Sequence, residues 1–257
     1  LYMDCNSIIY DEFRKLEQEI AKDKFFVENM ENILINNIIT KIGSYIDYVK
    51  PSGLVYIAFD GVAPFAKMDQ QRNRRHKNLI MRNIQNVISN SSITPVWSTS
   101  NITPGTKFMN HLSLKVRKAF TNLETHYNIK EIIVSGSDEP GEGEHKMFQH
   151  IRKNKNNIQG TIGVYGLDSD LIMLSLFHCK YFERMFIFRE TPEFGKNIVE
   201  DSQNSNYLFM DIPIFAKAIL SEMNCEMYDH HRLYDYIFMC FFLGNDFLPH
   251  FPSLNIR

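Results

Sequence analysis

The sequence predicts an α/β fold in which helices flank a mainly parallel central sheet. Short apolar runs alternate along the chain with longer segments of helical periodicity, which is the pattern of strands joined by crossover helices. The chain has 257 residues, of which 44% are hydrophobic, and this is enough to build one substantial core and excludes wholesale disorder. We therefore expect one domain that spans residues 1–257.

The apolar runs are expected to form buried strands. They cover residues 1–3, 54–59, 132–134, 161–165 and 184–188. In a doubly covered parallel sheet, strands are buried on both faces, so continuous apolar runs of this kind are typical of them.

The expected helices follow from periodicity and from capping residues. Apolar residues recur at i, i+3 and i+4 in segments 30–49 and 108–127, which predicts amphipathic helices. Asp211 is expected to be the N-cap of a helix that contains Pro213 and ends near residue 223, and residues 228–243 are apolar enough for a buried helix. The polar segments 89–106 and 190–206 are expected to be loops.

Composition excludes several classes of protein. No apolar run approaches the ~20 residues that cross a bilayer, so a membrane protein is excluded. The 28 Lys and Arg residues nearly balance the 30 Asp and Glu residues, which argues against a protein that binds nucleic acid by bulk positive charge. Four widely spaced cysteines without a C-x-x-C pair favour an intracellular compartment. The chain opens directly on an apolar run, so we expect it to be part of a longer protein.

Acidic residues follow the apolar runs at the points where those runs end. Because the carboxyl ends of parallel strands share one edge of a sheet, we expect these side chains to converge on one crevice. After the predicted strands they are Asp4, Asp60, Glu142, Glu144, Asp168 and Asp170, and Asp246 follows the last apolar helix.

So many carboxylates cannot all be ionised in one cleft without a counter-charge, because each raises the pKa of its neighbours. Oxygen ligands without clustered Cys or His favour Mg²⁺ or Mn²⁺, and a pair of ions roughly 3.5–4 Å apart can act on a phosphodiester. The spacing of Glu142 and Glu144, and of Asp168 and Asp170, is i, i+2, which places each pair on one side of an extended chain or around a glycine turn. The alternative for any single one of these residues is a helix cap or a turn former.

A basic segment at residues 67–82 is expected to form a helix beside these carboxylates. At ~100° per residue, four side chains fall within roughly a 100° arc of that helix. They are Lys67, Gln71, Arg74 and Arg75. Such a cluster suits a phosphate group, and together with the metals it predicts a nuclease that grips the end of a chain. The alternative is a solvated basic face.

The ordered motifs of the chain resemble the N-terminal conserved region of the XRN family of 5′→3′ exoribonucleases. The matching blocks are LYMDCNSIIY, YIAFDGVAPFAKMDQQRNRR, ITPGTKFM, PGEGEHK, GLDSDLIML and GNDFLPHFPSL. The resemblance implies a PIN-like fold of the flap-endonuclease group. It also implies that the seven acidic residues bind metal, and it assigns the four residues of the basic arc to a pocket for a 5′-monophosphate.

The resemblance also shows departures from the family pattern. Tyr10 stands where the family usually has a His that stacks on the first base, and we expect the tyrosine to stack as well. Phe65 replaces a usual Arg. The zinc-knuckle cysteines typical of nuclear members are missing between Asp170 and Asp246, which favours the cytoplasmic type.

The expected function is a 5′→3′ exoribonuclease that uses Mg²⁺ or Mn²⁺, with two ions, to release nucleoside 5′-monophosphates from single-stranded RNA with a 5′-monophosphate. Expected partners are decapping factors or the C-terminal remainder of the same protein. Two alternatives are a flap-type DNA endonuclease, which would cut internally, and a non-catalytic RNA-binding scaffold, which has no need for paired metals.

Overall fold

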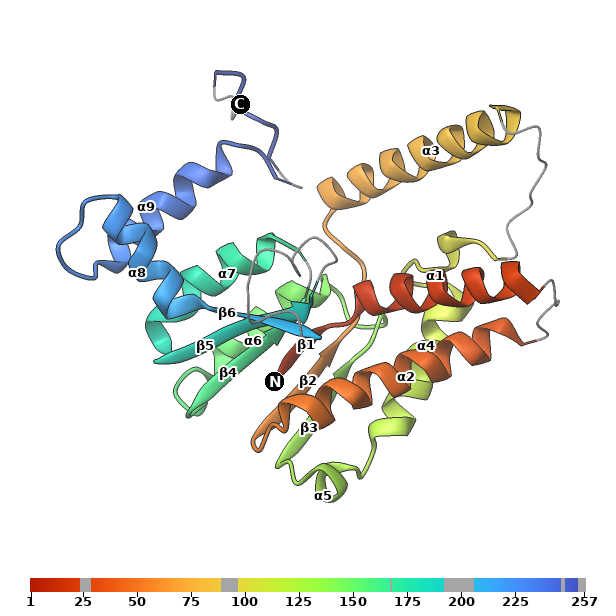
Figure 1. Cartoon of the computed structure of the whole chain (residues 1–257), viewed down its shortest axis with the longest axis horizontal. Helices are drawn as coiled ribbons and strands as arrows, with labels where there is room; N and C mark the ends of the chain where they lie inside the picture. The colour runs from red at the N-terminus through yellow and green to blue at the C-terminus, as the bar shows by residue number, and fades with distance from the viewer. Residues whose placement is uncertain (24–28, 89–96, 167, 192–205, 246–247, 254–257) are drawn as a thin grey trace.

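A six-stranded sheet forms the centre of the molecule in the computed structural model, with the strand order β3-β2-β1-β4-β5-β6 (Figure 1). The structure describes residues 1–23, 29–88, 97–166, 168–191, 206–245 and 248–253. The neighbouring strands from β3 to β5 are parallel, and β6 pairs antiparallel with β5. The strands are β1 (Tyr2–Asp4), β2 (Leu54–Ala58), β3 (Glu131–Ser135), β4 (Thr161–Tyr165), β5 (Arg184–Glu190) and β6 (Tyr207–Asp211).

Helices connect the strands and cover both faces of the sheet. They are α1 (Asn6–Asp23), α2 (Met30–Val49), α3 (Phe65–Ile88), α4 (Lys107–Phe120), α5 (Glu124–Tyr127), α6 (Gly143–Asn154), α7 (Asp170–His178), α8 (Ile212–Glu222) and α9 (His230–Phe241). Two 3₁₀ turns, η1 (Thr99–Asn101) and η2 (Cys179–Tyr181), complete the regular structure of the described residues.

The core consists of two clusters of buried side chains, one on each face of the sheet. Met3 and Ile57 belong to the cluster that packs under α1, α2 and α4, whereas Tyr2 and Tyr56 belong to the cluster under α6, α7, α8 and α9. Successive side chains of a strand point to opposite faces, so adjacent residues of β1 and β2 serve different clusters. This confirms the predicted α/β fold with a mainly parallel sheet.

The predicted strands are present, with boundaries shifted by one or two residues. Asp211 caps α8 as expected, since its side chain accepts a hydrogen bond from the backbone N–H of Ile214 at 2.9 Å. The sequence did not predict the helices α1, α6 and α7 or the antiparallel strand β6. The first two begin beside acidic and glycine-rich motifs that resemble turns. β6 carries a short apolar run, but this run lies between the polar segment 190–206 and the cap residue Asp211 and was not predicted as a strand.

Two predicted helices differ from the structure. The expected helix 108–127 ends at Phe120, because Asn122 adopts a left-handed conformation with φ of 63° that separates α4 from α5. The expected buried helix 228–243 is α9, and only Leu233 and Ile237 of it are buried. Periodicity alone does not tell how many faces of an apolar helix find a partner.

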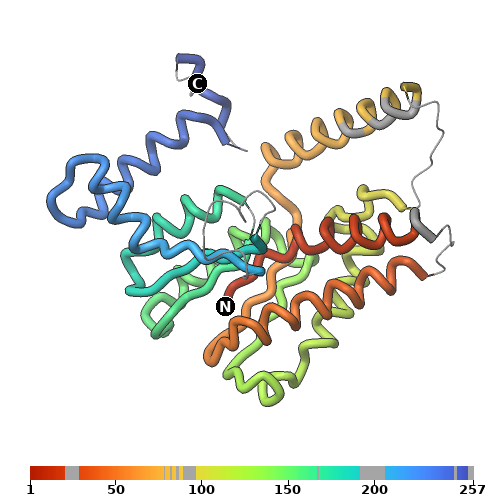
Figure 2. Tube along the Cα trace, viewed as in Figure 1, coloured from red at the N-terminus to blue at the C-terminus, as the bar shows by residue number. Residues whose placement is uncertain are grey.

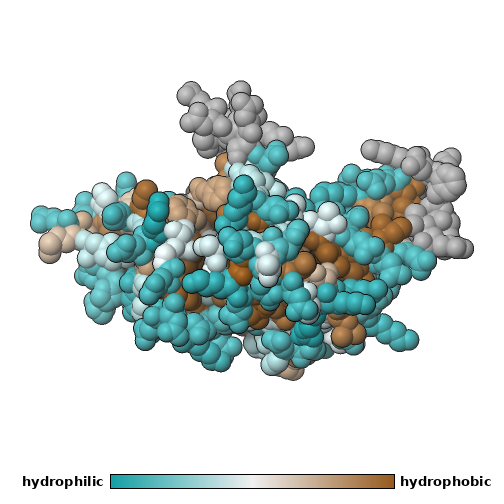
Figure 3. Space-filling view, turned by 90° about the horizontal axis from the view of Figure 1, so that it is seen from below, coloured by the Kyte–Doolittle hydropathy of each residue, from teal (hydrophilic) through white to brown (hydrophobic). Residues whose placement is uncertain are grey.

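The basic segment forms the 24-residue helix α3, which runs apart from the helices that cover the sheet (Figure 2). Its first turns lie at the candidate site, and its far end carries exposed apolar side chains, with Val87 77% and Ile88 80% exposed. On the underside of the molecule, hydrophilic side chains cover most of the surface, with smaller apolar areas between them (Figure 3). Among the described residues, no helix combines the length and the apolar character that crossing a membrane requires.

Candidate active site

The candidate site lies at the edge of the sheet where the carboxyl ends of the parallel strands meet. Asp4 is the last residue of β1, and Asp60 follows β2 by two residues. β1 also pairs in parallel with β4, after which the chain reaches Asp168. The topology therefore brings together carboxylates that are far apart in the sequence.

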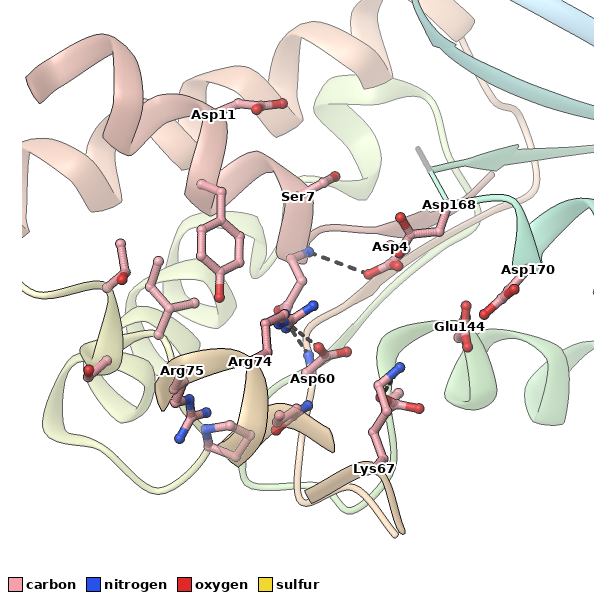
Figure 4. A pocket seen from close by; sticks show the side chains of 18 of the residues that line it. Asp4, Ser7, Asp11, Asp60, Lys67, Arg74, Arg75, Glu144, Asp168 and Asp170 are labelled. Carbon is pink, nitrogen blue, oxygen red and sulfur yellow. Dashed lines mark hydrogen bonds and ion pairs between the residues drawn. The ribbon is translucent and has the colours of Figure 1, made fainter. Parts of the chain in front are cut away.

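A cleft of about 710 Å³ at this edge contains most of the predicted site residues (Figure 4). Its acidic wall includes Asp4, Asp60, Glu142, Glu144, Asp168 and Asp170. Its opposite wall includes Lys67, Gln71, Arg74 and Arg75 from α3, with Tyr10 from α1. Asp246, the seventh predicted acidic residue, lies outside the described residues. The structure thus brings the described set into one cleft, and the roles of these residues stay predictions.

The acidic side chains approach one another in two places within the cleft. Asp4 lies beside Asp168, and Glu144 and Asp170 point toward one another (Figure 4). These carboxylates come from four different elements or loops, so their arrangement depends on the sheet and on the helices packed behind it.

Asn6 fixes the orientation of Asp60. The Asn6 amide donates a hydrogen bond to Oδ2 of Asp60, and its carbonyl oxygen accepts one from the backbone N–H of Asp60 at 3.1 Å. Oδ1 of Asp60 accepts a third hydrogen bond, at 2.7 Å, from the backbone N–H of Gly143. Both carboxylate oxygens are therefore held in place by the chain itself.

Two glycines allow the loops of the site to come close together. A Cβ atom at Gly143 would lie 2.7 Å from Oδ1 of Asp4, so a larger residue would push α6 and Asp4 apart. A Cβ atom at Gly61 would lie 1.7 Å from a backbone oxygen of the loop that leads to Glu142. Both positions need the absence of a side chain, as close backbone approach requires.

The two i, i+2 acidic pairs lie at points where the chain enters a helix. Glu142 is the N-cap of α6 and Glu144 lies in its first turn, while Asp170 lies in the first turn of α7. The free N–H groups of a helix N-terminus carry partial positive charge and favour carboxylates there. The sequence left open an extended chain or a glycine turn around these pairs; in the structure Gly141 adopts a left-handed φ of 99° directly before Glu142, and a helix that the sequence did not predict begins there.

Burial and mutual repulsion disturb the ionisation of the acidic wall. Burial, with the charges of Asp60 and Glu144, raises the pKa of Asp4 well above its usual range. Burial also raises the pKa of Asp60, and it raises the pKa of Glu144 to about 7, with the charge of Asp170 acting in the same direction. Protons relieve the repulsion in the protein alone, and a bound divalent cation would take over that role.

The residues of the acidic wall fit a divalent cation. Ligand atoms of Glu142, Glu144 and His145 all lie within 4.8 Å of one another. Oε2 of Glu142 is buried without a hydrogen-bond partner among the described residues, although Nδ1 of His145 is 3.4 Å away. A buried carboxylate oxygen left in this state is costly unless a ligand completes its contacts. Carboxylate donors are those that Mg²⁺ and Mn²⁺ prefer.

The basic wall is joined directly to the acidic wall. Nζ of Lys67 lies 3.1 Å from Oε1 of Glu142. Burial would raise the pKa of Glu142, but contact with His145 and the charge of Lys67 bring it below its usual range. Tyr10 is half-buried at the same end of the cleft, where burial raises its pKa against the opposing charges of Arg74 and Arg75.

Sequence reasoning did not identify three residues that shape the site. Asn6 orients Asp60, and His145 contacts the carboxylates of α6. Lys146 is buried, and its Nζ donates to the carbonyl oxygens of Phe59 at 2.8 Å and of Gly136 at 2.7 Å, which ties together the ends of β2 and β3. The lysine two residues after Glu144 was the available signal, but its burial depends on the tertiary structure.

Comparison with known proteins gives matches along the whole chain. A family model described as the XRN 5′-3′ exonuclease N-terminus matches residues 1–191, and one described as the Xrn1 helical domain matches residues 227–257. Similar curated proteins include 5′-3′ exoribonuclease 1 of Saccharomyces cerevisiae, at 32% identity, and 5′-3′ exoribonuclease 1 of Schizosaccharomyces pombe, at 34% identity. The 5′-3′ exoribonuclease 2 homolog of Caenorhabditis elegans is 31% identical.

Each of these alignments includes 100% of the chain, but only 18%, 20% and 31%, respectively, of the relative. The chain therefore spans between about a fifth and a third of the length of these curated relatives. Because the first family model covers well over half of the chain, and the strand-end carboxylates fall within it, the chain belongs to the XRN 5′-3′ exonuclease N-terminal family.

Proposed function

We propose that the chain is the nuclease part of a 5′→3′ exoribonuclease that acts on single-stranded RNA with a 5′-monophosphate. The observation that carries the proposal is the single cleft in which an acidic wall faces a cationic helix. The relatives named as 5′-3′ exoribonucleases support the reaction, and the cleft supports the details.

The acidic wall is the proposed cation site. We propose that two Mg²⁺ or Mn²⁺ ions bind at the two places where the acidic side chains approach one another. The residues that would hold them are Asp4, Asp60, Glu142, Glu144, Asp168 and Asp170. The chemistry available at such a site would be activation of a water molecule and neutralisation of charge on the leaving oxygen of the phosphodiester. The chain's own contribution is to present the carboxylates in a fixed arrangement, through Asn6 and Gly143.

The basic wall is the proposed end-binding pocket. Arg74 and Arg75 offer planar guanidinium groups that bind phosphate oxygens bidentately, and Lys67 and Gln71 add a point charge and an amide. Tyr10 offers a ring on which the first base can stack, a contact worth ~1–3 kcal/mol. The pocket therefore places the 5′ end so that the first phosphodiester reaches the acidic wall.

We propose that residues 1–257 fold as one unit, because both core clusters share the same sheet. We propose decapping factors or the C-terminal remainder of the same protein as partners. The relatives include both exoribonuclease 1 and exoribonuclease 2 proteins, so the cytoplasmic location remains a prediction.

The most direct test compares the rates at which the chain degrades two RNAs that differ only in a 5′-phosphate or a 5′-hydroxyl group. We expect the 5′-phosphorylated RNA to be degraded faster than the 5′-hydroxyl RNA, with nucleoside 5′-monophosphates as products. Equal rates would exclude the end-binding pocket, and cuts inside the RNA would favour the flap-type endonuclease. Absence of Mn²⁺ binding in calorimetry would favour the non-catalytic scaffold.

Replacement of one acidic residue tests the cation site. Asp168→Ala is expected to lower the cleavage rate at least about 100-fold, because it removes a proposed ligand from the acidic wall. Asp168 is exposed, so the melting temperature should stay close to that of the wild type. The matched control is Asp235→Ala on the exposed face of α9, which should keep the wild-type rate. Full activity of Asp168→Ala would contradict the assignment.

A further inference from the structure

An ion pair joins the two walls of the cleft. Lys67 belongs to the cationic face of α3, and Glu142 belongs to the acidic wall, yet Nζ of Lys67 lies 3.1 Å from Oε1 of Glu142. The side chains are only 14% and 6% exposed, respectively, so this pair is shielded from solvent. Lys67, which we propose binds the 5′-phosphate, therefore contacts a carboxylate oxygen of Glu142, which we propose binds the cation.

This pair opposes cation binding in two ways. A shielded ammonium group that holds Oε1 must give up that contact, or share it, before the oxygen can bind a metal. The positive charge of Lys67 also repels a second positive charge at the same carboxylate, and burial strengthens both effects. The other oxygen of Glu142 is buried and lies 3.4 Å from Nδ1 of His145.

A bound 5′-phosphate would change this balance. The lysine side chain is a flexible four-carbon stem with a compact charge, so its ammonium group can move a short distance to a new anion. The guanidinium groups of Arg74 and Arg75 line the same cleft and would hold a phosphate near it. Once Lys67 contacts the phosphate, Oε1 of Glu142 is free to bind the cation. The negative phosphate also offsets the positive charge of Lys67, so the cation is repelled less.

We propose that Lys67 couples the two halves of the cleft, so that a bound 5′-phosphate strengthens cation binding at Glu142. This inference rests on the proposed function. It makes Lys67 a specificity-determining residue in a second sense, because an RNA with a 5′-hydroxyl end would leave Glu142 engaged by the lysine and its cation site weaker. Selection for the 5′-phosphate would then act on the acidic wall as well as on RNA binding.

Thermodynamic linkage gives this coupling a measurable form. If the phosphorylated end tightens Mn²⁺ binding by some factor, Mn²⁺ must tighten binding of that end by the same factor. Couplings between sites are typically about 5- to 150-fold, and we expect at least about 5-fold here.

The test measures Mn²⁺ binding to the chain from the EPR signal of free Mn²⁺. It uses two oligonucleotides with phosphorothioate linkages that resist hydrolysis, identical except for a 5′-phosphate or a 5′-hydroxyl group. Both are added at saturation, which is checked by fluorescence anisotropy. Because the internal linkages are the same, any direct contact between them and the cation cancels in the comparison.

The wild-type chain should bind Mn²⁺ at least about 5-fold more tightly with the phosphorylated oligonucleotide than with its 5′-hydroxyl counterpart. Lys67→Met should bind Mn²⁺ without oligonucleotide more tightly than the wild type, and the difference between the two oligonucleotides should disappear. The matched control is Lys77→Met, which removes the same charge from an exposed position of α3 outside the cleft lining. It should behave as the wild type.

The outcomes separate this inference from the proposed function. If Mn²⁺ and the phosphorylated end both bind but neither affects the other, the coupling is refuted and the proposed function stands. Coupling of unchanged size in Lys67→Met, or weaker Mn²⁺ binding in that variant, would also refute it. The proposed function itself would be contradicted if the wild type did not bind Mn²⁺, or if it bound the 5′-phosphorylated and the 5′-hydroxyl oligonucleotide with equal affinity.

Discussion

At the scale of single residues, the site depends on side chains that are small or neutral as much as on the carboxylates. Gly143 lets the first turn of α6 approach Asp4, and its backbone N–H binds Asp60 at 2.7 Å. Asn6 holds the opposite side of Asp60. An acidic cluster can therefore keep its charges and still lose its geometry through a change at a neutral position.

Replacement of Gly143 by alanine tests this dependence. The added methyl group would lie 2.7 Å from Oδ1 of Asp4, so α6 or Asp4 must move. We expect Mn²⁺ to bind about 10-fold or more weakly, which is the size of effect seen when the support of a metal ligand is disturbed. Calorimetric titration with Mn²⁺ measures it.

Gly53→Ala provides the matched control, because a Cβ atom at Gly53 would have no neighbour within 4 Å. Its Mn²⁺ affinity should equal that of the wild type. Unchanged affinity in Gly143→Ala would mean that the close approach of α6 and Asp4 is not required for the cation site.

At the scale of elements, helix α3 combines two faces with different environments. Lys67, Gln71, Arg74 and Arg75 line the cleft, whereas Lys77 lies outside its lining. The helical periodicity of this segment was sufficient to predict which side chains share a face. The periodicity could not predict that Lys67 contacts Glu142, because that contact depends on the orientation that the loop after β2 gives to α3.

Replacement of one cation on the cleft face of α3 tests its proposed role. Arg75→Ala should reduce the preference for 5′-phosphorylated over 5′-hydroxyl RNA by about 10-fold or more, because a charge-assisted contact to phosphate is worth about 1.5–3 kcal/mol. The ratio of degradation rates on the two RNAs measures the effect. Lys77→Ala, on the same helix, should keep the wild-type ratio, and an equal loss in both variants would indicate a general effect of charge on RNA binding.

The helices and the strand that the sequence did not predict were missed for different physical reasons. α1 and α6 begin at residues that also favour turns and caps, such as Asn6 and the glycines around Glu142, so local preference did not distinguish a turn from a helix start. Strand β6 is partly exposed at the edge of the sheet, and its short apolar run directly precedes the cap of α8. Its pairing with β5 is a tertiary contact.

At the scale of the whole molecule, the sheet forces several buried carboxylates into one place, and this costs stability. Asp4, Asp60 and Glu144 have raised pKa values in the folded protein, to about 7 for Glu144. Such groups stabilise the fold only while they are protonated. Their contribution is complete below the unfolded pKa of about 4 and is lost as the pH rises through the folded values.

The stability of the chain in EDTA should therefore fall between about pH 5 and pH 8. Mn²⁺ should restore it, and more strongly at pH 8 than at pH 6, because protons no longer compete for the carboxylates. A cation at about 100 times its Kd adds about 2.7 kcal/mol, which corresponds to roughly 5–10 °C for a domain of this size. Thermal unfolding followed by circular dichroism measures both effects.

Glu144→Gln is the control for this prediction, since it removes the group with the pKa of about 7 and keeps its size. The loss of stability between pH 6 and pH 8 should be smaller in this variant than in the wild type. A stability that does not respond to Mn²⁺ at pH 8 would contradict the cation site.

The sequence by itself determined the α/β class, the strands of the parallel sheet and the residues that gather at its edge. It could do so because parallel strands end on one side, so acidic residues after each strand have only one place to converge. Only the tertiary structure decided how these groups are held: Asn6 against Asp60, Gly143 against Asp4, Lys146 between two strand ends, and Lys67 on Glu142. Those contacts join segments distant in the sequence, and their distances depend on packing, which no local pattern records.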